Sequence, residues 1–400
     1  MSQMKYKGAL FVTYGAMLFE GALNAVLVAA MIMLAQHFQK DVSDISVLVS
    51  LKGLGTLVSL YFSGRLSDRY GRKVVILAGL VCFSVFVFGM LATNIYALAM
   101  VFALFSGIGH GLMDAPAMSI LFDVFGNKTG PAMSMVQVFF SGGGVLTSLT
   151  ASILITRGWP WQYLFYGYAV MALLLCFVIV RSVYPPIAKL SGSGVHRIVF
   201  QKKPTVWKEG LILGCCAALL SVINAINSTW LPTFGIAVKG LNEGAAIRLL
   251  TFYQIGAVCG SFLFAYMLRK IHTSVLMVLN PLLGAVMLFL AITLGHPLLV
   301  YFFIFMTGMM MGVYFSLCIN MGGELFYESA GSATGAIGTI TMGGSTLMVM
   351  ITGKLLPIVG TTNLFFVSAI VMMLLGVMAF YFRTLYKACM PAAGGEQGND

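Results

Sequence analysis

The chain has 400 residues, of which 60% are hydrophobic and only 9% are charged, and its formal net charge at pH 7 is +11. A water-soluble chain would carry about 25% charged residues, so a soluble globular fold is excluded and most of the surface is expected to face lipid. Barrel strands alternate apolar and polar residues, whereas the apolar runs in this chain are long and uniform, which leaves membrane-spanning α-helices.

Apolar runs long enough to cross a bilayer follow one another along the whole chain. A run of roughly 18 or more apolar residues predicts one spanning helix. The first run has no small-residue cleavage site after it, so it is expected to span the membrane rather than to act as a signal peptide. About twelve spans are predicted, at residues 9–36, 44–66, 73–92, 95–121, 130–156, 160–183, 209–235, 244–268, 273–294, 297–323, 331–355 and 362–386.

The positive charges gather on one side of these spans. If both termini are cytoplasmic, as an even number of spans allows, most of the 23 Lys and Arg residues fall in cytoplasmic segments. Because cytoplasmic loops of membrane proteins are enriched in Lys and Arg, we expect a multi-pass protein of the cell membrane with both termini in the cytoplasm. This placement explains the net charge without nucleic acid as a partner.

A polar, basic stretch divides the chain into two parts of six spans each. It reads PPIAKLSGSGVHRIVFQKKPTVWKE and combines Pro, Gly and Ser with several Lys and Arg residues, as linkers do. The predicted parts are an N-terminal half at 1–184, a cytoplasmic linker at 185–208, a C-terminal half at 209–390 and a cytoplasmic tail at 391–400.

The two halves align at a constant offset of 201 residues. Repeats related by an axis along the membrane normal occur in transporters whose substrate site lies near the midplane, between the halves. We therefore predict an all-α membrane protein with twelve transmembrane helices in two pseudo-symmetric six-helix bundles. The offset places Gly55 on Gly256, Gly107 on Gly308, Gly111 on Gly312 and Asp123 on Glu324.

The loop between the second and third spans reads GRLSDRYGRKVV. It resembles the signature loop of the major facilitator superfamily, G-x-L-x-D-R-x-G-R-K. This resemblance implies the major facilitator fold and a secondary transporter that works by alternating access. It also implies a cytoplasmic gate, in which charged residues at helix ends latch that side shut, with simple charge anchoring as the alternative. The residues assigned to this gate are Gly64, Asp68, Arg69, Gly71, Arg72, Asp123 and Glu324.

The fourth span contains GIGHGLMDAPAM, which resembles the fourth helix of the fucose:proton symporter family, G-x-G-x-G-x-x-E-P-A-A-N. Asp114 falls on that family's membrane carboxylate, and Gln137 falls on a glutamine of its fifth helix. The sequence departs from the family pattern in having Asp for Glu, a displaced Pro116, and Met118 in place of the asparagine. The resemblance implies proton-coupled symport of a sugar-like solute, without identifying the sugar.

Three charged residues lie deep in the predicted spans, Glu20, Lys52 and Asp114. A charge at the bilayer midplane costs at least about 2.5 kcal/mol, and is tolerated where it faces a cavity, pairs with another charge or is neutralised by a proton. We expect Asp114 to carry a coupling proton, with helix packing as the alternative. Glu20 either couples to Asp114 in the same task or forms an ion pair with Lys52, which can also snorkel outward.

The offset maps these three charges onto the neutral residues Ser221, Tyr253 and Phe315. The ionisable chemistry is thus expected in the N-terminal half alone, while amide and aromatic groups suit a small neutral hydroxylated solute such as a sugar. Each of these polar side chains can instead hydrogen-bond another helix. The residues predicted to contact the substrate are Asn24, Gln137, Asn224, Asn227, Trp230, Tyr253, Gln254 and Tyr314.

The predicted function is secondary active transport, with proton-coupled symport of a hydroxylated solute preferred. The alternatives are a proton-coupled efflux antiporter of drugs, metabolites or amphiphiles, a lipid flippase, and a non-transporting receptor. An enzyme, a cofactor and a metal site are not expected, because no nucleophile–base constellation or ligand cluster is visible. The expected partners are a small-molecule substrate, protons and the lipid bilayer, and the chain is expected to be a monomer.

Overall fold

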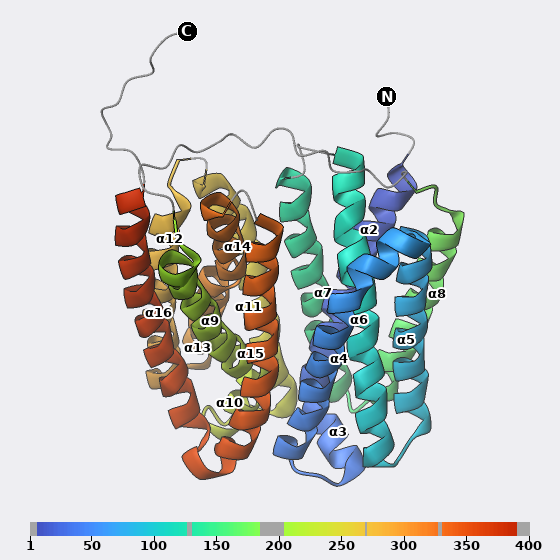
Figure 1. Ribbon diagram of the computed structural model, residues 1–400. Coiled ribbons are helices and arrows are strands. Elements are labelled where there is room, and N and C mark those ends of the chain that lie inside the picture. Colours follow the sequence, from blue (N-terminus) through green and yellow to red (C-terminus); the bar gives the residue numbers. More distant parts are fainter. Residues whose placement is uncertain (1–5, 126–129, 185–203, 269, 327–329, 390–400) are drawn as a thin grey trace.

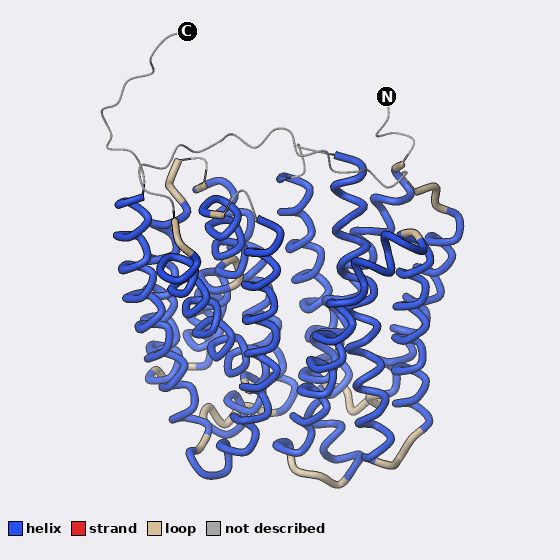
Figure 2. Tube along the Cα trace, in the orientation of Figure 1, coloured by secondary structure: helices blue, strands red, loops and turns tan. Residues whose placement is uncertain are grey.

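The computed structural model describes residues 6–125, 130–184, 204–268, 270–326 and 330–389, and this part of the chain is helical without a strand (Figure 2). The elements are α2 (Lys7–Ala29), α3 (Met31–Phe38), α4 (Val42–Tyr70), α5 (Arg72–Ala92), α6 (Tyr96–Phe125), α7 (Gly130–Thr156), α8 (Gln162–Arg181), the short π-helix η2 (Val206–Gly210), α9 (Leu211–Thr229), α10 (Leu231–Ala237), α11 (Glu243–Met267), α12 (Thr273–Thr293), α13 (Pro297–Met311), α14 (Tyr314–Leu325), α15 (Ala330–Val359) and α16 (Thr361–Cys389).

Twelve helical stretches within the described residues are long and apolar enough to cross a membrane, which confirms the predicted fold class. Breaks interrupt the first, seventh and tenth predicted spans. The first two breaks are alike, because Ala30 and Trp230 both leave the helical conformation with ψ of 2°. At the second break Pro232, in the first turn of α10, has no N–H with which to continue α9.

The helices form two bundles, α2 to α8 in one and α9 to α16 in the other (Figure 1). The repeat seen in the sequence is present in their packing. A Cβ added to Gly107 would overlap the carbonyl oxygen of Lys52, and a Cβ added to Gly308 would overlap that of Tyr253. The crossing of α4 with α6 is therefore reproduced by the crossing of α11 with α13, at equivalent residues.

The predicted boundaries of the two halves stay a prediction. Most of the predicted linker, 185–208, and the whole predicted tail, 391–400, lie outside the described residues.

The two bundles touch through α4 with α15 and through α7 with α11. Gly53 on α4 packs directly against the Thr346 side chain on α15. Gly64 follows Gly53 by eleven residues and Gly335 precedes Thr346 by eleven, which is about three turns, so each lies on the same helix face as that contact. Neither Gly64 nor Gly335 has any atom within 4 Å of an added Cβ. We call the end that carries the start of α2 and the end of α16 the termini end, and the opposite one the far end (Figure 1). The bundles therefore meet toward the far end and separate toward the termini end.

Candidate functional site

Helix α2 is buried along almost its whole length, and Asn24 interrupts this burial. Asn24 is the only exposed residue from Val12 to Ala35. Its Oδ1 accepts a hydrogen bond of 2.8 Å from Lys52 Nζ, and the same ammonium donates to the Leu23 carbonyl at 3.1 Å. Lys52 itself is only 4% exposed. A buried ammonium on α4 is thus held beside an accessible amide in the C-terminal part of α2.

Glu20 lies one turn before Asn24 on α2 and is fully buried. Neither of its carboxyl oxygens has a hydrogen-bond partner. The charges of Asp114 and Lys52 both act on this carboxyl, yet within the described residues no ion pair joins Glu20 to Lys52. Burying an ionised carboxylate without hydrogen bonds is very costly, so this geometry suits the protonated, neutral acid.

Helix α6 brings Asp114 into the same region, because it packs against both α2 and α4. Asp114 is half-buried. One turn earlier, His110 is buried, its Nδ1 has no hydrogen-bond partner, and its ring meets the edge of Phe140 at 6.1 Å. Pro116 lies inside this helix and lacks the N–H that an unbroken α-helix uses. The three charged residues predicted from the sequence therefore share one part of the N-terminal bundle.

The Lys52–Asn24 hydrogen bond was not anticipated from the sequence. A signal for it existed, since Asn24 follows Glu20 by four residues and so lies on the same helix face. Coupling of Glu20 to Asp114 and pairing of Glu20 with Lys52 during transport both stay predictions.

Several residues predicted to contact the substrate are occupied in internal packing in this conformation. Gln137 Nε2 donates to Ser141 Oγ at 3.2 Å on its own helix. Within the C-terminal bundle, Trp230 Nε1 donates to Thr352 Oγ1 at 2.9 Å, and this indole is fully buried.

Asn227 and Tyr314 are also buried within the C-terminal bundle. Asn227 Oδ1 accepts a hydrogen bond of 2.9 Å from Ser368 Oγ, whereas the Tyr314 hydroxyl has no hydrogen-bond partner. Their predicted contact with substrate would need this bundle to rearrange, and it stays a prediction.

The remaining predicted substrate residues lie at different depths. Gln254, on α11, reaches the other bundle, where its amide would lie 3.1 Å from a Cβ on Gly144 of α7. Tyr253 is buried against α13, and Asn224 is half-buried on α9. Together with the exposed Asn24, Gln254 is the predicted residue whose position best suits a solute held between the bundles.

The predicted gate residues of the N-terminal half meet at the termini end. Gly71 has φ of 90°, a conformation that favours glycine, and it makes the sharp turn from α4 into α5. Arg72 then donates to Asp68 Oδ1 at 2.6 Å and to Asp123 Oδ2 at 3.1 Å. All three helices involved belong to one bundle, so these ion pairs brace that bundle and do not join it to the other.

Glu324, the C-terminal gate residue, has partners in its own bundle. His272 Nε2 lies 3.4 Å from Glu324 Oε1, and the Tyr386 hydroxyl donates to the same oxygen. Neither partner was predicted from the sequence. The repeat offset could have found His272, which maps next to Arg72.

Two further basic residues of the signature loop also have local contacts. Lys73 Nζ donates to the Val180 carbonyl at 2.7 Å, and the Arg69 guanidinium lies over the Tyr70 ring at 5.4 Å. The bundles are separated at the termini end in this conformation. A latch between them there stays a prediction for the conformation in which the termini end is closed.

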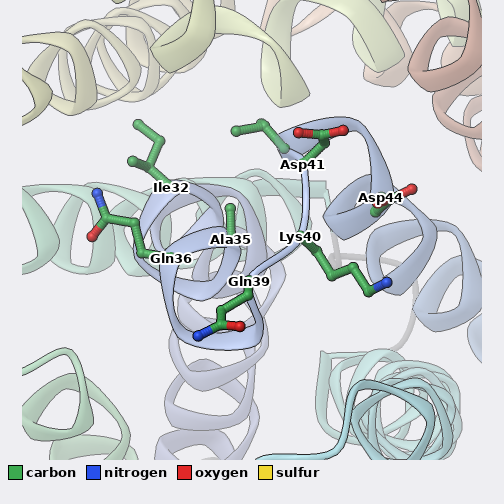
Figure 3. Close-up of a pocket in the computed structure, with 8 residues that line it drawn as sticks. Ile32, Ala35, Gln36, Gln39, Lys40, Asp41 and Asp44 are labelled. Atoms are coloured by element: carbon green, nitrogen blue, oxygen red, sulfur yellow. The ribbon is translucent and has the colours of Figure 1, made fainter.

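A hollow of about 550 Å³ lies at the far end, around the connection between α3 and α4. Figure 3 shows its polar side chains, among them Lys40, Asp41 and Asp44. Gln36 on its rim donates to Glu243 Oε1 at 3.1 Å and so bridges the two bundles. This hollow is separate from the buried acids. In the described part of the chain, no group of His, Cys, Asp and Glu could hold a metal ion.

Comparison with known proteins identifies relatives over most of the chain. The profile of the Major Facilitator Superfamily matches residues 12–345. The MFS-type transporter YfkL of Bacillus subtilis (strain 168) is 28% identical over 367 residues, which cover 91% of this chain and 92% of that protein. The inner membrane transport protein YdiM of Escherichia coli (strain K12) is 28% identical over 315 residues, 74% of each chain.

Two solved structures have a similar fold. A D-xylose-proton symporter matches with a TM-score of 0.75 and 16% identity, over 98% of this chain and 99% of its own. A bacterial homolog of the human lysosomal transporter Spinster, in an inward-facing and occupied conformation, matches with a TM-score of 0.73 and 15% identity, over 96% and 98%. The fold, the repeated helix crossings and the profile match agree, and the chain belongs to the major facilitator superfamily of membrane transporters.

Proposed function

We propose that this transporter is a proton-coupled symporter of a small hydroxylated solute, in which Asp114 and Glu20 carry the proton. The observation that supports this most directly is the burial of Glu20 without a hydrogen-bond partner, on a helix that packs against the helix of Asp114. Ionisable residues inside a membrane are costly and commonly mark proton pathways. Two such acids within electrostatic range of each other can share one protonation event.

The contact pattern between the bundles supports alternating access. Ser46 and Gly353 hold α4 against α15 near the far end, and Gly53 and Thr346 do so near the middle of the helices, whereas Gly64 and Gly335 face no neighbour toward the termini end. We propose that the termini are cytoplasmic, so that this conformation is open to the inside. Rocking of one bundle against the other around the buried acids would then expose them to the outside.

The nature of the solute is inferred from the side chains between the bundles. Asn24 and Gln254 offer amide donors and acceptors, which suit hydroxyl groups. A sugar–proton symporter with the same fold, though only 16% identical, makes a sugar or polyol a reasonable first class to test.

The test begins with a thermal-shift screen of the purified protein against sugars, polyols and organic acids, because a specific ligand stabilises the fold. The stabilising compound is then offered to proteoliposomes under an imposed inward proton gradient. Accumulation that collapses with a protonophore supports symport, and accumulation that survives the protonophore contradicts proton coupling.

Efflux by antiport uses the same two acids and is distinguished by direction. Inside-out and right-side-out vesicles given the same outside-acidic gradient separate the two mechanisms. A symporter moves solute in the direction of the proton, whereas an antiporter moves it against the proton.

A further inference from the structure

The hydrogen bonds of Lys52 and Glu20 are unequal, although both are buried in the same region. Lys52 has two acceptors, Asn24 Oδ1 and the Leu23 carbonyl, and Glu20 has no donor for either oxygen. Each of the two side chains nevertheless feels the charge of the other. In this conformation the Lys52 ammonium is hydrogen-bonded to the Asn24 amide and not to the Glu20 carboxyl.

This arrangement suits a neutral Glu20. If the carboxyl lost its proton, its negative charge would be buried without a hydrogen bond, and that state would need a cation. The ammonium of Lys52 stands on a flexible four-carbon stem. Asn24 and Glu20 lie one turn apart on the same face of α2, where neighbouring Cβ atoms are about 5–6 Å apart. A change of side-chain rotamer can therefore carry the ammonium from one to the other.

Among the described residues, the other elements packed against α2 bring no rival cation close to Glu20. Arg181 ends α8 next to Ser182, which contacts Gly8 at the start of α2, and His37 lies in the last turn of α3. Helix α6 contributes Asp114, which is an acid, and His110, which is buried next to the Lys52 charge. Helix α7 has no ionisable residue in its sequence. Helix α8 contributes Tyr168, whose hydroxyl is hydrogen-bonded with Thr147 at 2.7 Å. Lys52 is thus the cation that the described residues place within reach of an ionised Glu20.

We propose that Lys52 is a positioning residue that links the proton site to the substrate site by changing partners. When Glu20 is protonated, Lys52 holds Asn24. When Glu20 gives its proton to water, Lys52 keeps its own protons, leaves the Asn24 amide and pairs with the new carboxylate. The accessible Asn24 amide, whose oxygen Lys52 holds while Glu20 is protonated, then loses this support and releases the solute, so that proton and solute leave together as symport requires. This inference rests on the proposed function, since it takes Glu20 as a coupling acid.

The test reads the protonation of Glu20 directly, by infrared difference spectroscopy of the purified protein near neutral pH. The protonated-carboxyl band of Glu20 is the one that disappears in Glu20→Gln. In Lys52→Met the ionised acid has no cation, so the ratio of ionised to protonated Glu20 should fall by at least roughly tenfold, as expected for loss of a nearby opposite charge. Lys52→Arg, which keeps the charge, is the matched control and should stay close to wild type.

A second variant moves the ratio in the opposite direction. Asn24→Leu removes the competing acceptor, so Lys52 should turn to Glu20 and the ionised fraction should rise. Because Asn24 is exposed, this variant should fold even if Lys52→Met does not. A band unchanged in Asn24→Leu, or changed in the same direction as in Lys52→Met, would overturn the partner exchange.

The proposed function fails separately from this inference. If the two variants shift the Glu20 band in opposite directions but transport ignores the proton gradient, the partner exchange stands and proton coupling is wrong. If transport is proton-driven and the band does not respond to Asn24→Leu, coupling stands and the role of Lys52 is wrong.

Discussion

Arg72 Nε donates to Asp123 Oδ2 at 3.1 Å, and this ion pair has a counterpart in the other bundle, where His272 lies 3.4 Å from Glu324. The two acids are equivalent in the repeat, but their surroundings differ. The side chains of Arg72 and Asp123 are 7% and 4% exposed, whereas those of His272 and Glu324 are 44% and 24% exposed. The N-terminal pair is therefore a buried brace, and the C-terminal pair is partly solvated.

This difference predicts unequal losses of stability. Arg72→Ala removes the guanidinium from a buried carboxylate, a kind of change that costs about 3–5 kcal/mol. His272→Ala breaks a partly solvated pair and should cost about 1 kcal/mol or less. Thermal unfolding of the purified variants, followed by intrinsic fluorescence, measures both. Arg72→Lys keeps the positive charge but loses the fixed fork of guanidinium donors, so it is the control and should cost less than Arg72→Ala. Equal shifts in Arg72→Ala and His272→Ala would contradict the burial argument.

A second prediction concerns the close crossing of α4 and α6. In Gly107→Ala the new Cβ would overlap the Lys52 carbonyl oxygen, so the helices must move apart. Overpacking of this kind typically costs about 1–3 kcal/mol, and the equivalent Gly308→Ala should lower the melting temperature similarly. Gly64→Ala is the matched control, because nothing lies within 4 Å of its added Cβ and alanine is favoured over glycine in helices by about 1 kcal/mol. A melting temperature for Gly107→Ala as high as that of Gly64→Ala would show that the crossing tolerates a side chain.

Much of this fold could be predicted from the sequence because lipid imposes a simple rule. Each span must be long and apolar, so the spans can be located in the sequence. The offset that aligns Gly107 with Gly308 corresponds to two equivalent helix crossings in the structure. The breaks were not predicted. Pro232 offered a signal for the break at Trp230, but Ala30 has neither Gly nor Pro beside it, so the local sequence gives no signal for that break.

The sequence predicted the charged residues of the site but not which of them pair with one another. Glu20, Lys52 and Asp114 could be found because an ionisable residue in an apolar span is rare and costly. The partner of Lys52 could not be found, since Asn24, Glu20 and Asp114 are all chemically acceptable. Which of them receives the ammonium depends on side-chain geometry and protonation.

A third prediction tests the coupling role of Asp114. Asp114→Asn keeps the size of the side chain and its ability to hydrogen-bond, but the amide cannot gain or lose a proton in the pH range of the transport assay. Proton-driven accumulation of the solute identified by thermal shift should fall at least about tenfold, because loss of a coupling free energy of about 1.4 kcal/mol changes an equilibrium tenfold. Exchange of internal for external solute should persist. Uptake and counterflow in the same proteoliposomes measure the two activities. Accumulation at the wild-type level in Asp114→Asn would remove Asp114 from the proton path.

The fourth prediction uses the contact between α4 and α15 near the far end. An ideal Cβ on Gly353 lies 3.4 Å from Ser46 Cβ, close to the spacing of roughly 3.5–4.5 Å between the Cβ atoms of a disulfide. None of the seven native cysteines is in a disulfide, and all can first be replaced. The pair Ser46→Cys/Gly353→Cys should then oxidise to a disulfide that holds the far end closed. If the bundles must part there in each cycle, oxidation should abolish transport and a reducing agent should restore it.

The control for this experiment is a disulfide inside one bundle. An ideal Cβ on Gly8 lies 3.2 Å from Ser182 Cβ, and both residues belong to the N-terminal bundle. Because the bundles move against each other as units in the rocking mechanism, the pair Gly8→Cys/Ser182→Cys should oxidise and leave transport largely intact. Continued transport with the Ser46→Cys/Gly353→Cys disulfide fully formed would mean that the far end does not open. Loss of transport in both oxidised variants would mean that motion within the bundle is also required.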